Sequence, residues 1–149
     1  MKNLFNIIGF QLSWWACVLG VKYGYSYLGP ILMFLFIVIH FSIFKSQISE
    51  LKLIVLFAFI GTIIDTAIAN TGILIYNGSY SQELLIAPLW ITAMWCGFCA
   101  TINHSLSWLK GKWILCFLMG AIFGPLSYID GEKFEAISFQ SSLLTVNIV

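Results

Sequence analysis

The sequence contains no arginine and few charged residues of any kind. All seven basic residues are lysines, and charged residues make up 9% of the 149 residues, whereas a soluble domain carries about 25%. The formal net charge of +1 gives no basic patch of the kind that nucleic-acid binding requires. Linkers rich in proline, serine or charge are also missing, so we expect a single domain over residues 1–149.

The motifs of several common enzyme classes are also missing. No G-x-S-x-G, Walker A or dinucleotide-binding glycine pattern occurs. A membrane zinc hydrolase needs about three His or acidic ligands, and the apolar interior offers only Asp65, His104 and His40. The C-x-x-C spelling at 96–99 lies within an apolar run, away from the helix start that thioredoxin-type chemistry uses. We therefore predict no metal site and no cofactor, and we interpret the cysteines as packing residues.

Apolar residues are what the sequence has in abundance. They make up 60% of the chain, and a transmembrane helix needs about 20 of them in succession. The runs predict an all-α, polytopic membrane bundle with five transmembrane helices, at about 4–21, 27–44, 53–76, 87–109 and 113–129. The chain ends on AISFQSSLLTVNIV, which resembles the start of another crossing. Either a sixth helix is truncated here or this segment lies along the membrane interface.

The lysines predict the orientation of this bundle. One side carries five of them, Lys2, Lys45, Lys52, Lys110 and Lys112, accompanied only by the acidic residue Glu50. The other side carries Lys22 and Lys133. Lysines concentrate on the cytoplasmic side of membrane proteins, so we expect a multi-pass protein with its N-terminus in the cytoplasm.

A few polar residues interrupt the apolar runs. Asp65 lies on a face of small residues in the run at 53–76, and Asn103 and His104 interrupt the run at 87–109. Polar residues at such positions face the bundle interior, and helical side chains lean toward the N-terminus of their own helix. Because the two runs cross in opposite directions, we expect Asp65 to meet Asn103 and His104 inside the bundle.

This polar layer has two interpretations. A carboxylate beside an imidazole suits general base catalysis, which makes Asp65, His104 and Asn103 candidate catalytic residues. A buried carboxylate also needs hydrogen-bond donors merely to be tolerated, so the same residues could simply hold helices together. Polar or aromatic residues on neighbouring runs are candidate substrate-binding residues: Gln11, Trp14, Trp15, Trp95, Ser127 and Tyr128.

Four stretches occur in a recognisable order: NIIGFQLSWWACVLG, the lone Asp65, NHSLSW and GPLSY. On them the chain resembles, from Asn3 to about Ile137, a bacterial family of inner-membrane proteins catalogued as domain of unknown function 2878. The resemblance implies a polytopic protein of the bacterial inner membrane without an established activity. Genes of this family tend to lie near genes for fatty-acid-modifying enzymes such as cyclopropane-fatty-acid-synthase-like proteins. That neighbourhood implies a link to membrane lipid metabolism, with membrane lipid and lipid-modifying enzymes as partners.

Three functions follow from these patterns, and the sequence leaves open whether the protein is an enzyme. The first is an enzyme, or an enzyme's membrane subunit, that modifies lipid acyl chains at an accessible polar layer. The second is a lipid-binding or accessory scaffold protein, in which packing seals the layer. A small-molecule transporter ranks third, because paired broken helices or repeats are not seen. Gly120 and Gly124 form a G-x-x-x-G that also suits pairing of two copies, so a homo-oligomer stays open.

Overall fold

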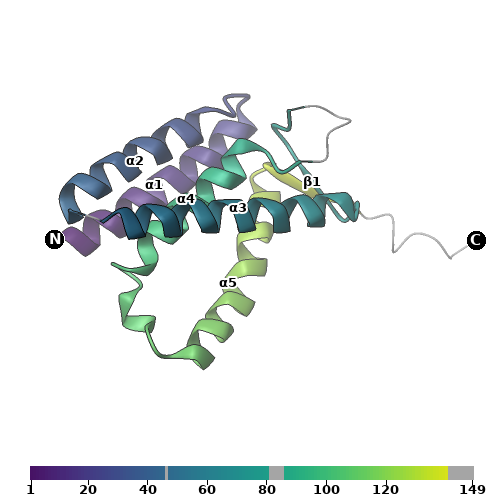
Figure 1. Cartoon of the computed structure of the whole chain (residues 1–149). Helices are drawn as coiled ribbons and strands as arrows, with labels where there is room; N and C mark the ends of the chain where they lie inside the picture. The colour runs from purple at the N-terminus through teal and green to yellow at the C-terminus, as the bar shows by residue number, and fades with distance from the viewer. Residues whose placement is uncertain (46, 81–85, 141–149) are drawn as a thin grey trace, which may run out of the picture.

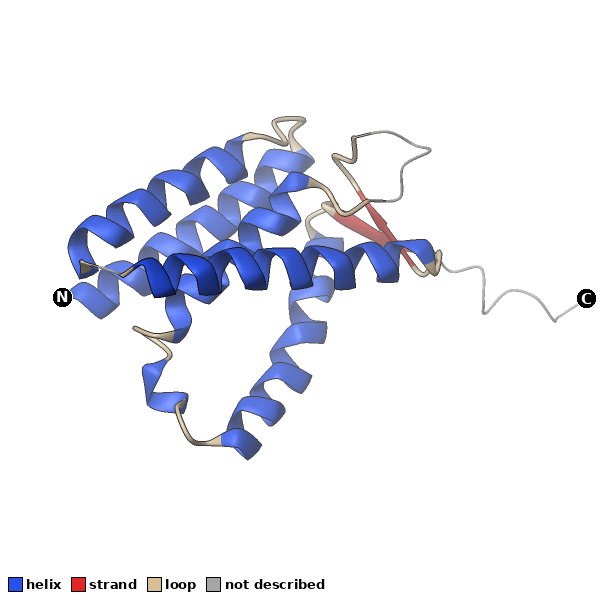
Figure 2. Ribbon diagram, in the orientation of Figure 1, coloured by secondary structure: helices blue, strands red, loops and turns tan. Residues whose placement is uncertain are grey.

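The computed structural model describes residues 1–45, 47–80 and 86–140, which are mostly helical (Figures 1 and 2). The helices are α1 (Lys2–Lys22), α2 (Leu28–Phe44), α3 (Ile48–Asn70), α4 (Leu89–Ile102) and α5 (Trp113–Lys133). The shorter elements are the 3-10 helix η1 (Ser107–Leu109) and the strands β1 (Leu74–Tyr76) and β2 (Ile137–Phe139). The predicted all-α class is confirmed.

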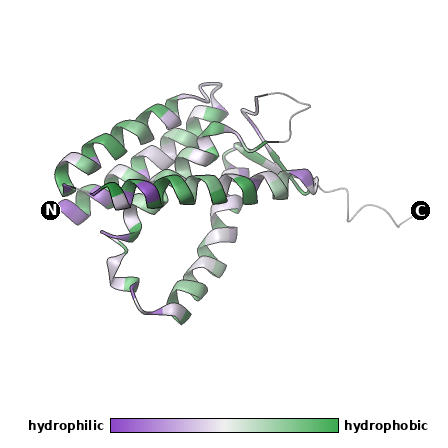
Figure 3. Ribbon diagram, viewed as in Figure 1, coloured by the Kyte–Doolittle hydropathy of each residue, from purple (hydrophilic) through white to green (hydrophobic). Residues whose placement is uncertain are grey.

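Three of the helices, α1, α3 and α5, are long and apolar enough to cross a membrane. The other two are apolar but shorter, with 17 residues in α2 and 14 in α4. At 1.5 Å per residue, α4 is about 21 Å long, less than the roughly 30 Å of a hydrocarbon core. Hydrophobic residues run along every helix (Figure 3), and many large ones point outward, such as Phe34 and Phe59. Outward apolar faces suit a lipid environment.

Helices α1, α2, α3 and α4 form the packed part of the bundle (Figure 1). Small residues at the crossings let backbones approach closely. Gly29 of α2 lies directly against the backbone of Cys17 in α1, and Gly97 of α4 lies against Met33 of α2. Two groups of buried apolar side chains result, one on each side of the middle of the bundle.

The small-residue face predicted around Asp65 is the face that α3 buries. Ala58, Gly61, Asp65 and Ala69 are all buried, and α3 packs against α4. The hydroxyls of Thr62 and Thr92 lie 2.8 Å apart across this contact. At Gly61 the indole ring of Trp95 occupies the space that a Cβ would need, so glycine is required there for close approach.

We expect Gly61→Ala to lower the free energy of unfolding by about 1–3 kcal/mol, the usual range for overpacking. The added methyl group must displace Trp95, whose indole is held by a hydrogen bond to Asp65. Tryptophan fluorescence during unfolding in detergent measures the change. Gly120→Ala is the matched control, because nothing lies within 4 Å of a Cβ added there. Equal effects of the two substitutions would contradict the expectation.

Helix α5 joins the bundle only at its C-terminal end, and its first half stands apart (Figure 1). Trp113 and Phe117 at that first half are 82% and 74% exposed. At the other end, β2 follows α5 and pairs antiparallel with β1, with Ile75 opposite Ser138. Strand pairing therefore ties the end of α5 to the end of α3.

Several boundaries differ from the prediction, including the start of the third helix at Ile48 and the end of the fifth at Lys133. The helix predicted at 53–76 ends at Asn70. It ends there because Gly72 adopts a positive φ of 73° and the following residues form β1. The helix predicted at 87–109 ends at Ile102, before the polar residues Asn103 and His104. The C-terminal segment begins as β2 and not as a sixth helix, and its continuation from residue 141 lies outside the described residues.

Candidate functional site

Polar side chains gather in two separate buried groups. The first, which we call the His104 cluster, contains Asn6, His40, Glu50, His104 and Ser105. The second, the Asp65 cluster, contains Asp65, Tyr76, Trp95 and Tyr128. They lie toward opposite ends of α3.

The His104 cluster forms where three helices end. His40 lies one turn before the end of α2, and Glu50 lies in the first turn of α3. Helix α4 ends at Ile102, and backbone hydrogen bonds from His104 and Leu106 to the carbonyl of Thr101 fold the next residues into a turn. This turn presents His104 and Ser105 to the other helices.

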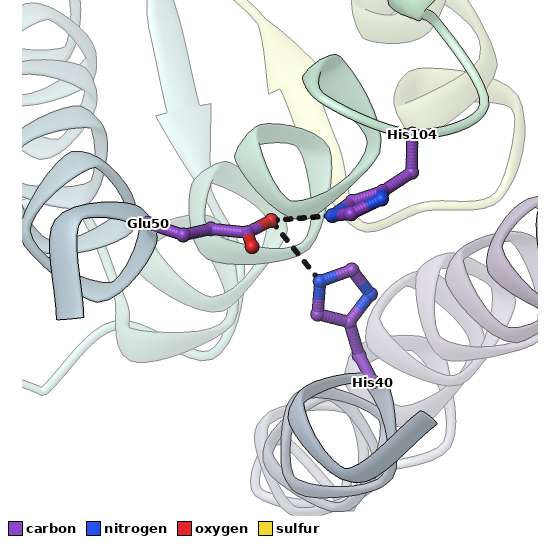
Figure 4. Close-up of side chains that lie close together, drawn as sticks. All are labelled: His40, Glu50 and His104. Carbon is purple, nitrogen blue, oxygen red and sulfur yellow. Dashed lines mark hydrogen bonds and ion pairs between the residues drawn. The ribbon is translucent and has the colours of Figure 1, made fainter. Parts of the chain in front are cut away.

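Glu50 lies at the centre of the His104 cluster (Figure 4). Its Oε1 atom lies 2.8 Å from Nε2 of His104 and 3.2 Å from Nε2 of His40. The side chain of His40 is fully buried, whereas that of His104 is 18% exposed. A carboxylate only accepts hydrogen bonds, so each contact is a hydrogen bond only where Nε2 of that imidazole carries the ring proton.

Asn6 supports the cluster from α1, and it is fully buried. Its Nδ2 atom lies 3.1 Å from Nδ1 of His40 and donates to the carbonyl of Ala100 at 3.2 Å. Its Oδ1 atom accepts from the hydroxyl of Ser105 at 2.6 Å and from the Ser105 backbone N–H at 3.4 Å. One amide thus joins α1, α2, α4 and the turn after α4.

The exposed edge of His104 faces an open cleft at this end of the bundle. Residues that line the cleft with His104 and Glu50 come from the α2–α3 connection, the start of α3 and the end of α4: Phe44, Lys45, Gln47, Ser49, Leu53 and Asn103. The ring of Phe44 lies 4.0 Å, centroid to centroid, from that of His104. A ligand can therefore reach His104 from outside, while His40 and most of Glu50 stay covered.

The Asp65 cluster is sealed by its own hydrogen bonds. Oδ1 of Asp65 accepts from the hydroxyls of Tyr76, at 2.6 Å, and Tyr128, and Oδ2 accepts from the indole N–H of Trp95 at 2.6 Å. Asp65 is 2% exposed. Burial, followed by the hydrogen bond to Asp65, raises the pKa of Tyr76 far above its usual value, so its hydroxyl stays protonated and keeps donating. This cluster joins α3, β1, α4 and α5.

The predicted contact of Asp65 with Asn103 and His104 is not formed. Fifteen residues of α3 separate Glu50, the partner of His104, from Asp65, a rise of about 22 Å at 1.5 Å per residue. The prediction was wrong about how α3 and α4 align: Trp95 of α4 donates to Asp65, and His104 follows Trp95 by nine residues, about 14 Å along a helix. Helix α4 itself ends at Ile102. Asn103 caps that end and lines the cleft beside His104.

The residues predicted to bind substrate are scattered. Trp95 and Tyr128 belong to the Asp65 cluster, whereas Trp14 and Trp15 stack edge to face, with ring centroids 5.2 Å apart. Gln11 lies on the exposed face of α1, and Ser127 is exposed and donates to the carbonyl of Gly124 in its own helix. The structure thus brings these residues to no common site, and their role in binding stays a prediction.

Four residues of the His104 cluster were not predicted as site residues: Asn6, His40, Glu50 and Ser105. One signal for Glu50 was present, since it is the only acidic residue among five lysines on its predicted side. Asn6 carries no such signal, because a single asparagine near the start of an apolar helix reads as an ordinary interfacial residue.

The cluster also contains a donor set that metal ions use. One ligand atom each from His40, Glu50 and His104 lies within 4.8 Å of the other two, and two imidazoles with a carboxylate occur in zinc sites. Zinc requires a lone pair on each ligating nitrogen. The position of the ring proton of His40 therefore decides whether these residues fit a metal.

The fold and the site together define a class of protein. It is a bundle of apolar helices, three of which are long enough to cross a membrane, and its polar cluster at one end can be reached from outside through the cleft. The chain belongs to the family described as protein of unknown function (DUF2878), whose model matches residues 3–149. No curated protein and no solved structure matches the chain.

Proposed function

We propose that this protein is a membrane enzyme, or the membrane subunit of one, that uses His104 as a general acid–base group on a membrane lipid. The observation that carries the proposal is the 2.8 Å contact between His104 Nε2 and Glu50 at the open cleft. A carboxylate that holds one ring N–H orients the imidazole and stabilises its protonated form. The other ring nitrogen, Nδ1, then takes and returns the proton, and no described residue forms a hydrogen bond with it.

The position of the cluster indicates which part of a lipid reacts. It lies at the ends of α2, α3 and α4, and helix ends of a membrane bundle lie near the polar headgroups. Lys45 lines the same cleft and supplies a positive charge for an anionic headgroup. The lysine distribution favours the cytoplasmic side for this end and for the N-terminus, and the family resemblance favours a bacterial inner membrane. The resemblance-based link to lipid metabolism agrees with a lipid substrate.

A second candidate is a non-enzymatic lipid-binding or accessory scaffold protein. The observation that favours it is the Asp65 cluster, where three donors and nearly complete burial leave no room for a reacting group. If the His104 cluster were equally structural, both polar groups would serve only to hold the bundle together. The two candidates therefore differ in what happens when His104 alone is changed.

The deciding experiment compares membrane lipid extracts by mass spectrometry. The cells carry wild-type protein, no protein, His104→Gln or His104→Ala, with protein levels in the membrane matched. We expect loss of the protein to change one lipid class and both variants to reproduce that change. His104→Gln is the sharper variant, because its amide can still donate to Glu50 but cannot exchange a proton. Ser42→Ala, at an exposed serine that bonds within α2, is the control.

Two outcomes would contradict the proposal. If deletion changes a lipid but both His104 variants restore the wild-type pattern, the accessory function is correct and the cluster is structural. If deletion changes no lipid, the assignment to lipid metabolism is wrong.

A further inference from the structure

Both ring nitrogens of His40 have a partner in the His104 cluster. Nε2 faces Glu50 at 3.2 Å, and Nδ1 faces the Asn6 amide nitrogen at 3.1 Å. A neutral imidazole carries one N–H and one lone pair, whereas an amide nitrogen only donates. If Asn6 presents Nδ2, then Nδ1 of His40 holds the lone pair and Nε2 holds the proton.

The orientation of the Asn6 amide is fixed by contacts that do not involve His40. Nδ2 donates to the carbonyl of Ala100, and Oδ1 accepts from the hydroxyl and the backbone N–H of Ser105. Turning the amide over would set its oxygen against the Ala100 carbonyl and its nitrogen against the Ser105 N–H. Asn6 and Ala100 are fully buried, so water cannot relieve the mismatch at the Ala100 carbonyl, and unsatisfied buried polar groups are strongly disfavoured.

We infer that Asn6 is a positioning residue that keeps the ring proton of His40 on Nε2, so that Glu50 accepts an N–H from each histidine and the cluster transfers protons without a metal ion. Metal-ligating histidines show the opposite pattern, in which the second ring nitrogen donates outward to an oxygen. With its proton on Nε2, His40 has no lone pair to offer where the three possible ligand atoms converge. Its N–H instead stabilises the Glu50 carboxylate, and His104 is the ring left to exchange protons at the cleft.

The catalytic part of this inference rests on the proposed function, but the position of the proton does not. Nuclear magnetic resonance of protein labelled with ¹⁵N-histidine, in detergent micelles, reports which ring nitrogen carries a proton. The chain has only two histidines, so His104→Gln assigns the signals. We expect wild-type His40 to be protonated on Nε2 with a lone pair on Nδ1, and one equivalent of Zn²⁺ to leave its signals unchanged.

Asn6→Asp tests the role of Asn6 directly. A carboxylate at this position accepts a hydrogen bond and does not donate one, so we expect it to draw a proton onto Nδ1 of His40. Asn3→Asp, at an exposed asparagine of the same helix, adds the same charge and leaves the His40 spectrum unchanged. A merely structural role for Asn6 would not move the proton in this way.

The wild-type spectrum decides the inference even if Asn6→Asp fails to fold. A proton on Nδ1 of wild-type His40, or signals of both histidines shifting together at one equivalent of Zn²⁺, would overturn it in favour of a metal site. The lipid comparison stays separate. A wild-type proton on Nε2 in a protein whose deletion changes no lipid would leave the inference standing and remove the proposed function.

Discussion

Replacing Asp65 with alanine is expected to lower the free energy of unfolding by about 3–5 kcal/mol, because three buried donors lose their acceptor together. The hydroxyls of Tyr76 and Tyr128 and the indole N–H of Trp95 all donate hydrogen bonds to this one carboxylate. The substitution also removes the side-chain hydrogen bond between Tyr128 of α5 and α3. Unfolding in detergent, followed by tryptophan fluorescence, measures the loss.

Asp130→Ala provides the matched control for Asp65→Ala. Asp130 is a half-exposed aspartate on α5 that pairs with Lys133 one turn away, and such surface pairs contribute about 0–1 kcal/mol. Asp65→Asn should fall between the two, because its amide oxygen still accepts but its amide nitrogen faces a donor. An Asp65→Ala protein as stable as the Asp130→Ala protein would show that the cluster does not hold the bundle together.

The second large effect is expected on activity and not on stability. Glu50→Gln should slow the proposed lipid reaction by about 10²–10⁴-fold, the usual contribution of general acid–base catalysis. The amide oxygen can still accept from both histidines, which meet Glu50 at the same Oε1 atom, but the substitution removes the negative charge that stabilises His104 when the ring takes up a proton. Conversion of the affected lipid over time, in membranes with matched protein levels, measures the rate.

Glu135→Gln is the control for the charge change. Glu135 is an exposed glutamate paired with Lys22 at 3.1 Å, far along the chain from the His104 cluster, and its variant should react at the wild-type rate. If Glu50→Gln also kept the wild-type rate, His104 would not depend on Glu50 and the acid–base proposal would fail.

The helices could be predicted from the sequence because hydropathy alone identifies them. Each predicted run overlaps one of the five helices, and the small-residue face around Asp65 is the one that α3 buries. The ends were harder. The apolar run continues past His104 in the sequence, but α4 ends at Ile102. The helix ends there because the side chains of His104 and Ser105 form hydrogen bonds with α3 and α1. Only the tertiary structure supplies those partners.

The partners of the two carboxylates could not be predicted for the same reason. Asp65 was expected to need donors, and it has them, but Tyr76 comes from a strand and Tyr128 from α5. Periodicity reports which face of a helix is buried and does not report which helix covers it. Asn6, His40 and Glu50 belong to three different helices, and only the packing of α1, α2 and α3 makes them neighbours.

The hydrogen bonds of Asp65 also set an order in time. Its three donors follow it in the chain by 11, 30 and 63 residues. A chain made from its N-terminus therefore exposes this carboxylate well before Tyr128 has been synthesised. Until then the carboxylate has two of its three donors, Tyr76 and Trp95, and because a charge with too few partners is costly inside a bilayer, the surroundings of Asp65 are completed only when α5 arrives. Assembly of this bundle thus has a late step. In a ribosome-bound chain that ends before Tyr128, Asp65 would still lack the hydrogen bond from the Tyr128 hydroxyl.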